Sequence, residues 1–88
     1  MAAAQRMTLD ANNGQGTISS VLQSTVYVNS KLLSVNGSSV QNHVLHVGVT
    51  TANGSDTVKA GGLGVNRTGD ADSCGHTRGG GSDDVNIG

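Results

Sequence analysis

Four side chains of this chain are suited to binding a transition metal: His43, His46, Cys74 and His76. Imidazole nitrogens and a thiolate are ligands that zinc prefers, and a closed tetrahedral zinc site takes four of them. The first two form a His-x2-His pair, and residues 74–76 form a Cys-x-His pair. The spacing therefore suggests a zinc site that cross-links two turns.

An alternative explanation needs no metal. The two nearby histidines would then be polar residues beside a strand, and Cys74 would be a small buried apolar side chain, as free cysteines often are. His43 and His46 would lie on opposite faces of a straight strand, so a shared metal requires a bend or helical turn between them. The residue types alone leave both explanations open.

A metal bound by all four side chains would be structural, because four protein ligands leave no position for a reactive water. The enzymatic alternative is a nucleophilic Cys74 with His76 as its base. This glycine-rich segment offers neither a side chain to orient the base nor a pocket for a substrate. We therefore expect no enzymatic activity and no catalytic residues.

The elements that position these side chains must fold with a small core. The chain has 88 residues, an apolar content of 34%, and Tyr27 as its single aromatic residue. Chains of this size usually need a disulfide, a metal or a larger partner for stability. One cysteine cannot form an intramolecular disulfide. We expect residues 1–88 to form a single domain that is stabilised by a metal, by docking on a partner, or by both.

Apolar periodicity predicts short β-strands. Val26 and Val28 alternate with their neighbours, and so do Val47 and Val49, as residues of half-buried strands do. Fourteen glycines make a long helix costly, by about 1 kcal/mol for each glycine relative to alanine. Turns with positive φ are predicted at Asn36-Gly37, Asn53-Gly54 and Gly61-Gly62. The sequence thus predicts an all-β fold.

Internal repeats indicate how the strands are organised. Residues 54–61 and 81–88 are identical at five of eight positions, and residues 23–29 form a looser copy. This alignment makes Val26, Val58 and Val85 equivalent, at spacings of 32 and 27 residues. Arg67-Thr-Gly-Asp70 similarly echoes Arg6-Met-Thr-Leu-Asp10. The repeats predict a compact, closed arrangement with threefold pseudosymmetry.

Charge argues against nucleic acid and anionic lipid as partners. The chain has five Lys and Arg residues and a formal net charge of −1. Both kinds of partner are recognised through clustered positive charge. We expect neither to bind.

The later part of the chain resembles the PAAR-repeat family, the tip proteins of contractile injection machines. The family unit is a valine strand, Asn-Gly, Pro-Ala-Ala-Arg, x-Gly-Asp, a metal-ligand turn and a closing Gly-Ser-x-x-Val. The corresponding segments here are residues 58–63, 64–67, 68–70, 74–76 and 81–88. Weaker copies of the tetrapeptide occur at residues 3–6 and 32–35. Its proline is replaced by Gly64, Ala3 and Leu32 in the three copies.

The resemblance implies a small conical domain of short strands with pseudo-threefold repeats, held together by one zinc ion near its apex. Family sites use three histidines and one cysteine, which assigns the zinc to His43, His46, Cys74 and His76. Iron is the alternative metal.

The resemblance also implies a mechanical function. The base would cap a trimeric β-helical spike, one tip per trimer, and the apex would lead penetration of a target envelope with only transient contact. Candidate residues for the base are Leu32, Leu33, Val35 and Leu63, and the alternative for each is a place in the core. The chain ends on the last repeat, which suggests a lone tip, either in the virion of a contractile-tailed phage or on a type VI secretion spike released from a bacterial cytoplasm. The rival interpretation is a zinc-stabilised binding module for protein or RNA.

Overall fold

The computed structural model describes residues 2–42, 47–82 and 84–87, which form short β-strands, isolated bridges and turns. The strands are β1 (Ala2–Ala3), β2 (Ile18–Ser20), β3 (Tyr27–Val28), β4 (Lys31–Leu32), β5 (Ser39–Val40), β6 (Lys59–Ala60), β7 (Leu63–Gly64) and β8 (Asn86–Ile87). No helix long and apolar enough to cross a membrane occurs in these ranges. The predicted all-β fold is confirmed.

Three extended segments in the middle of the molecule are joined into a closed ring, which we call the central ring. Bridges pair Ala4 with Arg67, Arg6 with Leu33, and Val35 with Val65. The amide of Gln5 donates to the carbonyl of Asn66 at 3.1 Å, Asn66 donates to Ser34 at 3.0 Å, and Ser34 donates to Gln5 at 3.0 Å. These three residues are fully buried. The ring therefore satisfies its own buried backbone groups.

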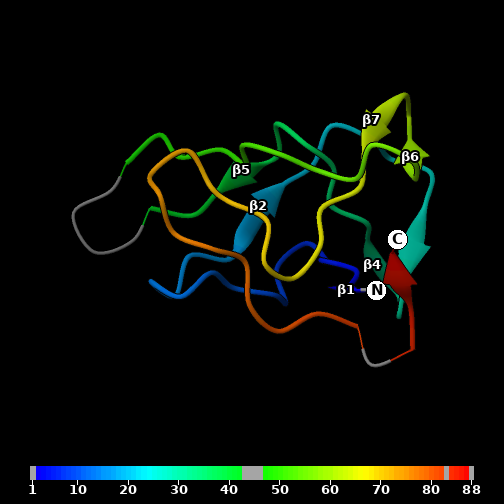
Figure 1. Cartoon of the computed structure of the whole chain (residues 1–88), viewed down its shortest axis with the longest axis horizontal. Helices are drawn as coiled ribbons and strands as arrows, with labels where there is room; N and C mark the ends of the chain where they lie inside the picture. The colour runs from blue at the N-terminus through cyan, green and yellow to red at the C-terminus, as the bar shows by residue number, and fades with distance from the viewer. Residues whose placement is uncertain (1, 43–46, 83, 88) are drawn as a thin grey trace.

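Three antiparallel strand pairs lie at one end of the molecule, together with both chain termini (Figure 1); we call this end the base. The register pairs Val28 with Lys31, Ala60 with Leu63, and Ala2 with Ile87. Pairs β3–β4 and β6–β7 are closed by two-residue turns in which both residues have positive φ, Asn29-Ser30 and Gly61-Gly62. Such turns match the twist of the strands that they join.

The valines of the aligned segments make the same hydrogen bonds at all three strand pairs. Each valine carbonyl accepts at 3.0 Å from an amide of the central ring: Val26 from Leu33, Val58 from Val65, and Val85 from Ala4. Each valine amide donates to a side-chain oxygen three residues earlier, on Gln23 (2.8 Å), Ser55 (2.9 Å) and Ser82 (3.0 Å). One local arrangement thus occurs three times around the ring.

Three further hairpins, which we call the first, second and third tip hairpins, extend from the ring away from the base (Figure 1). Their arms are bridged at Ala11–Thr17, Ser39–Thr50 and Ala71–Thr77 respectively. The first and third have the same tight turn, in which Gln15 donates to Asn12 and Gly75 donates to Asp72, each at 3.0 Å. Gln15 and Gly75 both have positive φ, 67° and 93°. The second hairpin has a longer connection.

Backbone hydrogen bonds also join the tip hairpins to one another. Gln41 donates to Thr17 at 2.7 Å, Ser73 donates to Thr50 at 2.8 Å, and Asn13 donates to Thr77 at 3.0 Å. Each hairpin therefore donates to one neighbour and accepts from the other. The overall extents are 31 × 24 × 21 Å.

Two separate apolar clusters fill the interior. The base cluster consists of Ala4, Val28, Leu33, Val35, Ala60, Val65 and Ile87, with Leu63 and Val85 packed against it. The tip cluster consists of Ile18, Val40 and Val49, with Met7, Val21 and Cys74 packed against it. In the part of the chain that the structure describes, the apolar cluster is therefore larger at the base.

Two strand predictions were wrong in detail. Val49 is buried, but Val47 is 75% exposed, because Gly48 between them has φ of 65° and the chain turns there instead of continuing as a strand. Val28 is buried within β3, whereas Val26 precedes the strand and is 39% exposed.

The turn predictions were confirmed at Gly37 and at Gly61-Gly62, which have positive φ, and were wrong at Asn53-Gly54. Gly54 is instead required by close packing, because a Cβ atom there would lie 2.5 Å from the carbonyl oxygen of Gly64.

The candidate base residues divide into two groups. Leu33 and Val35 are buried in the base cluster, as the core alternative predicts, whereas Leu32 and Leu63 are partly exposed.

Candidate metal centre

Cys74 lies within the turn of the third tip hairpin and His76 directly follows that turn; both are half-buried. The turn is closed by the amide of Asp72, which donates to the carbonyl of His76 at 2.8 Å. Gly75 between the two residues has φ of 93°, a conformation that favours glycine. This geometry places the Cys74 Sγ atom 3.4 Å from His76 Nδ1.

The distance between these two atoms fits a shared zinc ion. Bond lengths of about 2.3 Å to sulfur and about 2.0–2.1 Å to nitrogen at a tetrahedral angle separate the two ligand atoms by about 3.5 Å. The observed separation is 3.4 Å. The same separation fits a hydrogen bond between the thiol and the imidazole, and it would also fit two ligands of one metal, with Nδ1 as the ligand nitrogen of the histidine.

His43 and His46 lie outside the described residues, but the residues on either side of this segment are described. Val40 and Val49 belong to the tip cluster, against which Cys74 also packs. Thr50 and Ser73 are joined twice, by the Ser73 amide on the Thr50 carbonyl at 2.8 Å and by the Thr50 amide on Ser73 Oγ at 3.1 Å. The arm at Thr50 is thus hydrogen-bonded to the third tip hairpin, and both arms contribute a valine to the cluster against which Cys74 packs.

A complete ligand set is not found within the described ranges. Among residues 2–42, 47–82 and 84–87, no group of three or more His, Cys, Asp or Glu side chains could hold a metal. In particular, Asp72 does not join Cys74 and His76 in such a group. The assignment of zinc to His43, His46, Cys74 and His76 therefore stays a prediction, supported by the geometry of the last two.

A buried ion pair that the sequence did not reveal lies beneath the tip hairpins. Arg78 and Asp72 have fully buried side chains, and Arg78 Nη1 lies 2.9 Å from Asp72 Oδ2. The guanidinium also donates to Gln5 Oε1 at 3.1 Å and to the carbonyls of Gly16 at 3.1 Å and Asp10 at 2.7 Å. Arg78 thus connects the central ring with the first and third tip hairpins, and these partners compensate the buried charge.

The carboxylate of Asp72 has a second function in the same region. Its Oδ2 atom also accepts from Asn12 Nδ2 in the first tip hairpin at 2.7 Å. Its Oδ1 atom is buried and has no hydrogen-bond partner in the described part of the chain. Arg78 is followed by three glycines, a composition that is typical of an exposed loop. No local pattern indicates that its side chain is buried.

The tip hairpins are oriented by turns at the edge of the central ring. Arg6 donates through its amide and Nε to Asp10 Oδ2, both at 2.8 Å. Arg67 makes the same two bonds to Asp70 Oδ2, at 2.8 and 3.1 Å. The hydrogen bond to Asp70 raises the pKa of Arg67 above its already high ordinary value, so the guanidinium stays charged at ordinary pH. The two segments that were matched in the sequence thus make the same contacts.

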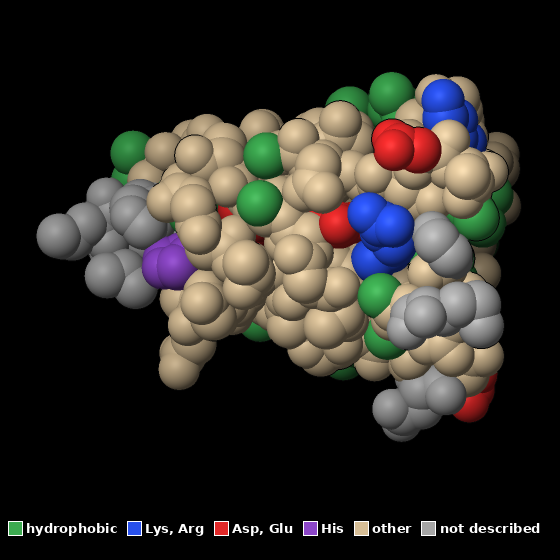
Figure 2. All heavy atoms as spheres, viewed as in Figure 1, with side chains coloured by type: hydrophobic (Ala, Val, Ile, Leu, Met, Phe, Trp, Pro, Cys, Tyr) green, Lys and Arg blue, Asp and Glu red, His purple; other side chains and the backbone are tan. Residues whose placement is uncertain are grey.

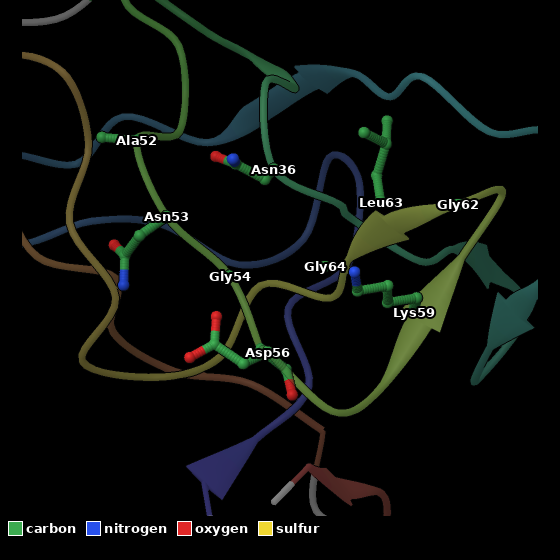
Figure 3. A pocket seen from close by; sticks show the side chains of 10 residues that line it. Asn36, Ala52, Asn53, Gly54, Asp56, Lys59, Gly62, Leu63 and Gly64 are labelled. Carbon is green, nitrogen blue, oxygen red and sulfur yellow. The ribbon is translucent and has the colours of Figure 1, made fainter.

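A polar pocket of about 340 Å³ lies beside the β6–β7 hairpin (Figure 3). Its lining includes the side chains of Asn36, Asn53, Asp56 and Lys59 and the backbone of several glycines. Neither Cys74 nor His76 lines it. The pocket is therefore separate from the candidate metal centre.

In comparisons with known proteins, no family model and no curated protein matches this chain. The resemblance to PAAR-repeat proteins accordingly rests on the residues quoted for it. The metal centre rests on the separation of Cys74 and His76 and on the packing of the second tip hairpin against the third.

Proposed function

We propose that this chain is the tip of a spike in a contractile injection machine, a conical domain with pseudo-threefold repeats that is held together by one zinc ion. The observation that supports this proposal most strongly is the hydrogen-bond pattern that occurs three times around the central ring. Its backbone bonds join Gln5, Ser34 and Asn66, and equivalent bonds are made at Val26, Val58 and Val85. The proposed role is structural, and the chain acts on no substrate.

The base would dock on a trimeric β-helical spike, one tip for each trimer. Three strand pairs surround the ring at this end, so a pseudo-threefold monomer can match a true threefold partner. Such a match would also cover the strand edges that the end of a β-helix otherwise exposes. Tyr27 in β3 is 61% exposed and offers a large apolar surface for this contact.

The zinc would stabilise the opposite end, which leads penetration of the envelope. Cys74 and His76 would bind it from the third tip hairpin, and His43 and His46 from the second. Iron is the alternative metal. The bound ion supplies a cross-link between two hairpins and needs no reactive water. We place the tip in the virion of a contractile-tailed phage, or alternatively on a type VI secretion spike.

A zinc-stabilised binding module for protein or RNA is the second candidate. On the face drawn in Figure 2, the Lys and Arg side chains are few and no basic patch is formed, which disfavours RNA. Tyr27 is the only aromatic side chain available to stack on a base. A protein partner other than a spike remains the stronger form of this alternative.

Binding to the isolated end of a trimeric β-helical spike distinguishes these functions. We expect a complex of one chain per trimer in analytical ultracentrifugation. Tyr27→Asp at the base should weaken it, whereas Leu9→Asp should not, although Leu9 is also half exposed, at 50%. No association at high concentration, or equal effects of the two substitutions, would contradict docking through the base.

A further inference from the structure

Gly14 in the first tip hairpin lies directly against the imidazole ring of His76. A Cβ atom on Gly14 would lie 2.4 Å from His76 Cε1, 2.7 Å from Nδ1 and 2.9 Å from Nε2. All three distances are shorter than real Cβ contacts allow, and they involve both ring nitrogens. Gly14 has no positive φ, so an alanine could adopt its backbone conformation. The space taken by His76 is therefore the reason why this position needs glycine.

Gly14 and Cys74 occupy the same place in equivalent turns. Gly14 follows Asn12 by two residues, and Cys74 follows Asp72 by two residues. Asn12 and Asp72 each accept at 3.0 Å from the residue with positive φ in their turn. The third hairpin thus has a thiol at the position where the first has no side chain.

The backbone around Gly14 is held firmly and cannot move away from the ring at low cost. Asn12 Oδ1 accepts from the amides of Gly14 at 2.9 Å and Gly16 at 2.8 Å. The amide of Asn13 donates to the Thr77 carbonyl at 3.0 Å, which fixes the turn against the third hairpin. A side chain at position 14 would consequently displace the His76 ring, which can rotate, rather than the backbone.

We propose that Gly14 is a positioning residue for the metal centre: by lacking a side chain, it allows the His76 ring to keep Nδ1 within 3.4 Å of Cys74 Sγ. This inference rests on the proposed zinc site. It assigns a part in that site to the first tip hairpin, which supplies no ligand. The third hairpin would bind the ion through Cys74 and His76, and the first shapes the space for one of these ligands.

The test is zinc affinity of the Gly14→Ala chain, measured by competition with a chromophoric chelator. We expect affinity to fall by about 10- to 100-fold, as it does when the support of a metal ligand is lost. Gly79→Ala is the matched control, because its φ is also not positive and its nearest atom, the carbonyl oxygen of Ala11, lies 3.4 Å from the built Cβ. The control should bind zinc like the unsubstituted chain. The metal-free forms of all three chains should unfold at similar denaturant concentrations.

A His76→Ala background shows whether the effect passes through the ring. With the imidazole removed, Gly14→Ala should change the residual zinc affinity less than twofold, because coupled sites are not additive. Equal affinity of Gly14→Ala and the unsubstituted chain would overturn the inference and leave the zinc site standing. An equal loss in the His76→Ala background would also overturn it. Absence of zinc binding by the unsubstituted chain would overturn the site itself, and this inference with it.

Discussion

The base and the tip end of the molecule are stabilised in different ways. Among residues 2–42, 47–82 and 84–87, seven buried apolar residues form the base cluster and three form the tip cluster. Beneath the tip hairpins the interior is polar, with the buried pair of Arg78 and Asp72 and the amide of Asn12. The base thus depends on apolar packing, and the tip depends on polar links and on the proposed metal.

This difference explains where a metal would have the largest effect. Apolar burial contributes about 25 cal/mol for each Å² removed from water, so the base cluster can stabilise its strands without help. A buried ion pair contributes little net stability, because desolvation offsets most of the attraction. If a zinc ion joins the second and third hairpins as proposed, its contribution to stability should therefore be largest at the tip.

Removing the metal should produce the largest effect and should separate the two ends. Structural zinc sites contribute on the order of 10 kcal/mol to folding, so a strong chelator at neutral pH should lower the melting temperature markedly. Acid should act in the same direction, because the ligands bind zinc only when deprotonated. In amide hydrogen exchange, Asn13, Gln41 and Ser73 should lose protection.

The ring amides of Gln5, Ser34 and Asn66 serve as internal controls, because they are fully buried beside the base cluster. They should keep more protection than the tip amides after chelation. Uniform loss at both ends would remove the distinction between base and tip. An unchanged melting temperature would contradict the stabilising role of the metal.

Replacing Arg78 should have the next largest effect. Arg78→Met leaves the carboxylate of Asp72 buried without its cation, which should lower the free energy of unfolding by about 3–5 kcal/mol. Arg67→Met is the control, since the Arg67 side chain is 26% exposed and its pair with Asp70 should contribute about 1 kcal/mol or less. Urea unfolding measures both. If both substitutions lower the free energy of unfolding by the same amount, the buried pair of Arg78 and Asp72 contributes no more to stability than the partly exposed pair of Arg67 and Asp70.

The smallest effect on stability is expected from a circular permutation that moves the chain ends from the β1–β8 pair to the β6–β7 pair. Ala2 pairs with Ile87 as Ala60 pairs with Leu63, and two residues connect the latter pair. A chain in which Asn-Gly joins Ile87 to Ala2, and which is opened between Gly61 and Gly62, should keep its stability within about 1 kcal/mol. Thermal unfolding followed by circular dichroism measures this. Loss of cooperative unfolding would contradict the proposed equivalence of the three strand pairs.

The sequence was informative where local patterns decide the structure. Glycine content and short apolar alternations predicted an all-β chain, and Gly37, Gly61 and Gly62 adopt the expected positive φ. It failed where contacts between distant segments decide. Gly54 is small because the backbone of Gly64 approaches it, a reason that no pattern around residue 54 contains.

The candidate site divides in the same way. The Cys-x-His spacing predicted that the Cys74 and His76 side chains lie close together. They do, because a tight turn fixes their geometry. The proposed positioning role of Gly14 depends on its contact with His76, which is more than fifty positions away. The hydrogen bonds of Arg78 to Gln5, Asp10 and Gly16 span similar distances in the sequence. Such contacts can be found only in the folded structure.

Metal content is the most direct test of the account, because it decides whether the proposed zinc ion is present at the tip. Plasma mass spectrometry of chain purified without chelator should find about one zinc ion per chain. The ion should be lost in Cys74→Ser, and zinc should bind more weakly in His46→Ala. Chain that contains no metal, or that retains its full zinc content in Cys74→Ser, would contradict the metal centre and the proposed basis of tip stability.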